Sequence, residues 1–142
     1  MPIECSIVFP RLSVSDMAEI DFRVMRHVFG VHNALGCLCD ESVYQNLLAP
    51  TLIMAGIHAT REVSVKISFR TFSKPLYLDL VVYQSVIYEL KAIEKITPAH
   101  VNQLLNYLFL TNSARGKLVN FRPSSVESQF VNATLDDSER RR

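Results

Sequence analysis

The 142-residue sequence lacks a long apolar run, a marked excess of one charge and an even number of cysteines. No stretch approaches the roughly 20 apolar residues that span a bilayer. The opening MPIECSIVF has neither the basic start nor the apolar run of a secretory signal. The three cysteines, Cys5, Cys37 and Cys39, are odd in number, so no disulfide framework is expected. These absences predict a reduced cytoplasmic protein that is neither secreted nor inserted in a membrane.

The composition indicates a folded domain, because 49% of the residues are hydrophobic and only 20% are charged. The net charge of +1 excludes a strongly basic nucleic-acid coat. It leaves room for a local basic groove, because the field at a cleft depends on where the charges sit. We expect one domain over residues 1–135 and a mobile polar tail over 136–142.

Apolar residues recur every three or four positions in three segments and alternate in several others. Helices are therefore predicted over 13–36, 40–57 and 97–112, and strands over 62–69, 76–83, 85–93, 116–121 and 126–135, with a marginal strand at 3–9. Pro50 lies inside the second helix and is expected to kink it or split it in two. The order predicts an α/β fold, with a mixed four- to five-stranded sheet flanked by helices.

Three charged residues interrupt apolar strand patterns in the middle of the chain. Asp79 lies inside YLDLVV, although aspartate is disfavoured in strands. Glu89 and Lys91 are two residues apart and therefore lie on the same side of the next strand. Two carboxylates and an ammonium on one sheet face are costly to bury unless they bind something. Carboxylates suit Mg²⁺, and a nearby lysine can orient or deprotonate water and stabilise charge on a phosphate.

Taken alone, a Glu–Lys pair of this spacing is more simply a solvated ion pair, since such pairs are common and weak. Other residues change the balance. Glu41 opens the second predicted helix, and His100, Gln103 and Tyr107 lie on one stripe of the third, at offsets of three and four. This pattern resembles the GxxExxY proteins of the PD-(D/E)XK nuclease superfamily. In that family a helix glutamate is followed by a strand aspartate, an ExK strand and a helix with Q-x-x-x-Y.

The resemblance covers most of the chain, from about VMRHVFGVHNALG to GKLVNFRPSSVESQFVNATL. It implies a nuclease core of the order α-β-β-β-α-β. The glutamine and tyrosine of the third helix would orient the lysine or a phosphate. The catalytic residues so implied are Glu41, Asp79, Glu89, Lys91, Gln103 and Tyr107.

The resemblance also implies a metal site. Asp79 and Glu89 would hold a divalent ion, Mg²⁺ or Mn²⁺, together with the carbonyl of Leu90, and Glu41 would reach the ion or its water from the helix. Three positions depart from the family pattern. Leu38 stands where the motif begins with glycine, and Tyr77 stands where a basic residue often precedes the aspartate. Pro50 interrupts the helix that carries Glu41.

The metal site requires a particular strand register. Directly opposed residues of an antiparallel pair have a constant number sum, and Asp79 shares a face with Glu89 only if that sum is even. A two-residue turn at Gln84 and Ser85 would make the sum odd, so we predict a three-residue turn or a bulge. If Glu41 belongs to the site, its carboxylate is expected within about one water of Asp79 or Glu89.

Other residues carry weaker signals. His32, Cys37 and Cys39 could form a soft-metal site, but their spacing matches no standard zinc pattern, and structural cysteines are favoured. Two groups of basic residues fit either solvated positions or a rim that follows phosphates. These groups are Arg61, Lys66, Arg70 and Lys74, and Arg115, Lys117 and Arg122.

The leading hypothesis is a Mg²⁺-dependent nuclease that hydrolyses phosphodiester bonds, in DNA rather than RNA. Its partner would be nucleic acid and no membrane, and a homodimer is left open. The alternative is a catalytically silent nucleic-acid or protein interaction module that keeps the nuclease fold. A third reading is a subunit that is active only with a partner.

Overall fold

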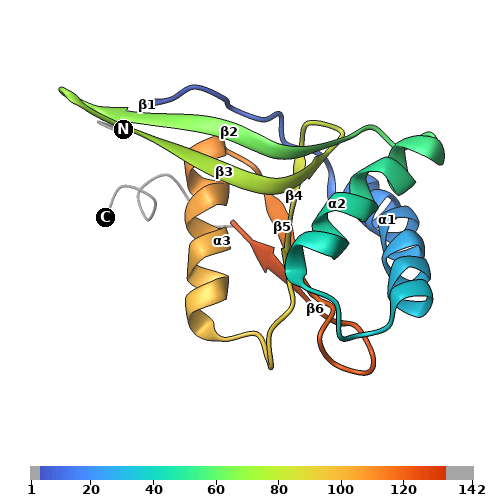
Figure 1. Cartoon of the computed structure of the whole chain (residues 1–142). Coiled ribbons are helices and arrows are strands. Elements are labelled where there is room, and N and C mark those ends of the chain that lie inside the picture. Colours follow the sequence, from blue (N-terminus) through green and yellow to red (C-terminus); the bar gives the residue numbers. More distant parts are fainter. Residues whose placement is uncertain (1–3, 134–142) are drawn as a thin grey trace.

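Helices lie on both faces of a mixed six-stranded sheet in the computed structural model, which describes residues 4–133 (Figure 1). The helices are α1 (Val14–Leu35), α2 (Glu41–Met54) and α3 (Pro98–Thr111). The strands are β1 (Glu4–Cys5), β2 (Ala59–Phe69), β3 (Phe72–Val82), β4 (Val86–Lys91), β5 (Arg115–Asn120) and β6 (Glu127–Asn132). No helix in this range is long and apolar enough to cross a membrane. The predicted tail lies outside the described residues.

The strands follow one another across the sheet in chain order, and within residues 4–133 only β4 and β5 run parallel. That parallel pair needs a crossover, which α3 supplies. The predicted mixed sheet with flanking helices is confirmed. Five strands, β2 to β6, make up its body, and the two-residue β1 extends it at one edge.

The helix boundaries follow from capping. The Ser13 hydroxyl accepts the Asp16 N–H at 3.1 Å at the start of α1, and Gly36, with a φ of 76°, ends it. Pro50 does not split the second helix, so that alternative was wrong. The proline is exposed, and α2 continues past it because the helix keeps an apolar face in the core, with Leu48 and Leu52 fully buried.

Two hydrophobic clusters fill the two sides of the sheet. One joins α1 and α2 to the sheet, and the other lies against α3. Leu80 belongs to the first cluster and Leu78 to the second, although residues two apart normally share a face. The β2–β3 ribbon therefore twists sharply at Asp79, between them. Glu62 on β2, with a left-handed φ of 52°, lies at the same level.

A buried ion pair fastens α1 to the sheet. Lys117 on β5 lies 2.9 Å from the Asp21 carboxylate of α1, and the Tyr88 hydroxyl donates to the same carboxylate at 3.0 Å. The two charged side chains are 8% and 13% exposed. The Lys117 ammonium also lies 4.3 Å from the centre of the Phe130 ring. Lys117 therefore has a structural role and does not form part of a phosphate rim.

We expect Lys117→Met to lower the free energy of unfolding by about 3 kcal/mol, because it leaves the Asp21 carboxylate buried without its cation. The double variant Asp21→Leu/Lys117→Met should recover most of that loss, since no buried charge remains. Urea unfolding followed by circular dichroism measures both. Equal stabilities of the single variant and the wild-type protein would contradict a buried ion pair.

Candidate metal centre

The connection between β3 and β4 has the three residues that the register requires. Val82 pairs with Val86 and Leu80 with Tyr88, so opposed numbers add to an even sum. Tyr83 and Gln84 in the turn have left-handed φ values of 52° and 55°. The predicted three-residue turn is confirmed, and the same register continued by one residue sets Asp79 opposite Glu89.

The backbone pairing between β3 and β4 ends just before this pair, and side-chain oxygens take over. The Leu90 N–H donates to Asp79 Oδ2 at 2.9 Å, and the Asp79 N–H donates to Glu89 Oε1 at a long 3.4 Å. On the other side, the ladder of β2 and β3 skips the pair Glu62–Asp79. Asp79 therefore lies where β3 separates from β4 and where its pairing with β2 is interrupted for one residue.

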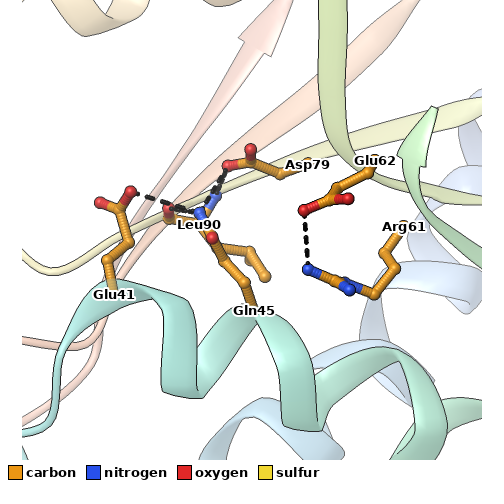
Figure 2. A network of polar contacts seen from close by, with 6 residues as sticks. All are labelled: Glu41, Gln45, Arg61, Glu62, Asp79 and Leu90. Atoms are coloured by element: carbon orange, nitrogen blue, oxygen red, sulfur yellow. Dashed lines mark hydrogen bonds and ion pairs between the residues drawn. The ribbon is translucent and has the colours of Figure 1, made fainter. Parts of the chain in front are cut away.

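Glu41 reaches this opening through an intermediary, Gln45, one helical turn further along α2 (Figure 2). Gln45 Nε2 lies 3.2 Å from Glu41 Oε2, 3.4 Å from Asp79 Oδ2 and 3.3 Å from the carbonyl oxygen of Leu90. The other oxygen of Glu41 accepts the Ala92 N–H at 3.1 Å. Glu41 is thus linked to Asp79 by one amide nitrogen, in the place where we expected one water.

The three oxygens around Gln45 Nε2 indicate what the site can hold. An amide NH₂ has two hydrogens and cannot make three well-aligned bonds, and the three distances are all at the long end of the usual range. Two carboxylate oxygens and a carbonyl are hard donors of the kind that Mg²⁺ binds. No cluster of three or more His, Cys, Asp or Glu side chains within residues 4–133 has metal-binding geometry. Carbonyl, water and phosphate oxygens would have to complete the coordination.

Glu89 is the most strongly perturbed acid of the site. It is 3% exposed, and burial raises its pKa well above the usual value, with the Asp79 charge acting in the same direction. The positive charge of Lys91 lowers the pKa of Glu89 and so offsets part of this shift. In the range 4–133, the half-buried Lys91 takes part in neither of the two ion pairs. Its ammonium therefore remains available to a ligand.

Two of the predicted residues, Gln103 and Tyr107, lie on α3 and contact each other. The Gln103 side chain donates to the Tyr107 hydroxyl at 3.2 Å. Burial, followed by the charges of Glu89 and Asp79, raises the pKa of Tyr107. His100, on the same stripe, is placed elsewhere, because its Nδ1 accepts the Thr97 N–H at 3.0 Å and caps the helix.

Gln45 and Asn120 belong to the site but were not predicted from the sequence. Fully buried Asn120 accepts the Ile93 N–H at 3.0 Å and donates to the Ile93 carbonyl at 2.8 Å, which fixes the segment after Lys91. The spacing of Gln45, four residues after Glu41 on a helix, could have indicated that the two share a face. Asn120 carried no such signal, because a polar residue near a strand end is common.

The soft-metal alternative does not form. His32 Nε2 contacts the Pro123 carbonyl at 3.0 Å, and Arg122 donates to the carbonyls of Cys37 and Cys39, both at 2.9 Å. Arg122 is therefore a structural residue that holds the loop before α2. The thiols of Cys37 and Cys39 are free, which agrees with structural cysteines.

Comparison with known proteins agrees with this geometry. A family model described as the PD-(D/E)XK nuclease superfamily matches residues 18–132. A solved structure titled "Crystal structure of SSO0001" aligns with a TM-score of 0.52 at 21% identity, over 89% of this chain and 64% of that chain. At that identity the likeness shows the fold alone, and the present chain spans less than two thirds of that protein. A search of curated proteins gives no match. The match to the family model, which includes Glu41, Asp79, Glu89, Lys91, Gln103 and Tyr107, shows that the chain belongs to the PD-(D/E)XK nuclease superfamily.

Proposed function

We propose that this protein is a Mg²⁺-dependent nuclease that hydrolyses phosphodiester bonds in DNA, with Mn²⁺ as an alternative cofactor. The observation that carries the proposal is the group of three oxygens around Gln45 Nε2, beside buried Glu89. The acids of such a site suit a metal cation, and the nearby ammonium of Lys91 suits a phosphate. The choice of DNA over RNA rests on the family resemblance, and so does assignment to the GxxExxY group.

Each residue has a distinct part in this proposal. Asp79, Glu89 and the Leu90 carbonyl would hold the ion, and Glu41 would accept a hydrogen bond from water on it. A bound Mg²⁺ would polarise the phosphate and lower the pKa of water. Lys91 would stabilise the negative charge that develops on the phosphate as the water oxygen attacks phosphorus and the ester bond breaks.

The α3 residues would act on the substrate side of the site. Tyr107, held by Gln103, keeps its proton because its pKa is raised, so its hydroxyl can donate a hydrogen bond. A phosphate oxygen is a suitable acceptor, since hydrogen bonds to charged oxygens are stronger than neutral ones. The Gln103 side chain is exposed and can contact either Lys91 or the phosphate.

The test is incubation with single- and double-stranded DNA and RNA, in Mg²⁺ or Mn²⁺ and in EDTA. We expect metal-dependent cleavage of DNA, and a loss of at least roughly 100-fold in rate for Lys91→Ala, the scale for removing a catalytic electrostatic group. Metal binding, measured by calorimetry, should persist in that variant because its ligands are oxygens. Cleavage that survives Lys91→Ala unchanged would contradict the role of the lysine. Absence of cleavage on all four substrates would favour the interaction module or the partner-dependent subunit.

Gln45 should compete with the metal ion, because its amide donates to the same oxygens that the ion would bind. We expect Gln45→Ala to bind Mg²⁺ or Mn²⁺ more tightly, by roughly three- to tenfold, the value of one modest hydrogen bond. Calorimetry on the purified variant measures this directly, without any turnover. Asn46→Ala, an exposed neighbour on the same helix, is the control. Weaker metal binding in Gln45→Ala would mean that its carbonyl oxygen is itself a ligand.

The raised pKa of Glu89 predicts a pH-dependent stability in EDTA. Its folded-state pKa lies above the ordinary value of 4.5, so the native state binds the proton more tightly than the unfolded chain does. This stabilisation is complete below pH 4.5 and is lost as the pH rises through the folded-state pKa. We therefore expect the melting temperature of the wild-type protein to fall, relative to that of Glu89→Gln, which cannot ionise, over the range in which the pH is raised above 4.5. A constant difference over that range would contradict the shift.

A further inference from the structure

The outer part of the β2–β3 hairpin, residues 63–78, extends beyond β4 as an arm, whose inner end packs on α3 through the buried Val65 and Leu78. β3 pairs with β4 only over Leu80–Val82, so the arm has β2 and β3 paired with each other and β1 on one edge near the tip. Figure 1 shows this ribbon extending past α3, away from α1 and α2. The base of the arm is Asp79, so the arm begins where the candidate metal centre lies.

The arm carries positive charge in a chain that is almost neutral overall. Lys66, Arg70 and Lys74 lie on it, all exposed, and residues 63–78 contain no acid. The adjoining β1 contributes one acid, Glu4, which pairs opposite Ser68. Three cations against one anion leave a net charge of +2 on the arm and β1 together, against +1 for the whole chain.

Large aromatic side chains lie among these charges and are open to solvent. Phe69, Phe72 and Tyr77 are 37%, 58% and 60% exposed. The Arg70 guanidinium lies 5.1 Å from the centre of the Phe69 ring. Tyr77 precedes Asp79 by two residues, or about 7 Å along a strand. Exposed rings interleaved with cations provide stacking surfaces for bases and counter-charges for phosphates.

Protection of a free strand edge explains only part of this pattern. Lysine and proline on an edge discourage pairing with other chains, which accounts for Lys74 and Pro75 on the outer part of β3. It does not account for Lys66, because the backbone of that residue is already paired with Ser6, by bonds of 2.8 and 2.9 Å. It also does not account for Tyr77, since a large exposed ring does nothing to prevent pairing.

We propose that the arm binds a single-stranded segment of nucleic acid, with Lys66 and Arg70 on phosphates and Tyr77 stacked on a base. The proposal deepens the proposed nuclease function. Binding of the strand by the arm does not depend on that function, whereas delivery of the strand to the site at Asp79 rests on it. A single strand is favoured over a duplex because stacking on exposed rings needs open base faces. Its binding is measurable without cleavage, so the two proposals fail separately.

The test is fluorescence anisotropy of a labelled 20-nucleotide oligothymidine in EDTA, over a series of salt concentrations. We expect Lys66→Ala/Arg70→Ala to weaken binding roughly tenfold near 0.1 M salt and to reduce the slope of log affinity against log salt by about 1.4, the loss of two phosphate contacts to a single strand. The matched control, Arg23→Ala/Arg26→Ala, removes two exposed charges from α1. It should bind within about twofold of the wild-type protein, since it lies outside the arm.

Tyr77 separates stacking from charge. Tyr77→Ala should weaken binding roughly tenfold with no change in the salt slope, and Tyr77→Phe should bind like the wild-type protein. The proposal would be overturned if the arm variants and the α1 variant lost the same amount of affinity for oligothymidine. It would also be overturned if a duplex of the same length bound the wild-type protein as tightly and lost as much affinity in the arm variants. Thermal melting of every variant checks that the fold is kept. If the arm variants lose binding as expected while no substrate is cleaved in Mg²⁺, arm binding stands and the nuclease function does not.

Discussion

The hydrogen bond from the Leu90 N–H to the Asp79 carboxylate holds open the sheet, and the candidate site depends on that opening. In an uninterrupted antiparallel pair, the N–H of Leu90 would bond to a backbone carbonyl of β3. Here a side chain accepts it, so β3 and β4 remain paired over Leu80–Val82 and separate beyond. The Leu90 carbonyl is then available on the site side, where Gln45 contacts it. A buried backbone group thus stays satisfied while an oxygen is presented to a ligand.

The negative charges of the site are only partly compensated by groups of the chain itself. Glu89 is buried and lies beside the half-buried Asp79, which raises the free energy of the doubly ionised form. The chain reduces that energy by a shared amide donor, Gln45, and by the nearby charge of Lys91. Both compensations are partial, since the amide bonds are long and Lys91 is half-buried without an ion pair within residues 4–133. Incomplete compensation of this kind is typical of places that bind ions, because a fully satisfied site would have no affinity left for a ligand.

The sequence predicted the order of the elements and the register of β3 and β4, but neither the full length of the β2–β3 hairpin nor the contacts between separate elements. Alternation located the strands, and the parity that the metal site needs predicted a three-residue turn or a bulge, of which the structure has the turn. An aspartate inside an apolar strand was visible as an anomaly because propensity disfavours it. The partners of Gln45, Asn120 and Lys117 were not predictable, since each depends on how separate elements pack. Pro50 misled for the same reason, because the buried face of α2 outweighs one lost backbone bond.

Lys117 and Lys66 also show why net charge was a weak guide to the function. Both are lysines on strands of one sheet, and the sequence grouped each with arginines as a candidate phosphate contact. Lys117 neutralises a buried carboxylate, so its charge is not available at the surface. Lys66 stays exposed on the arm, whose residues 63–78 include no acid. A chain with a charge of +1 can therefore separate its charges, with acids gathered at the opening around Asp79 and cations on the arm that begins there. A polyanion would be repelled by the carboxylates of the site, and the cations on the neighbouring arm offset that repulsion by attracting it.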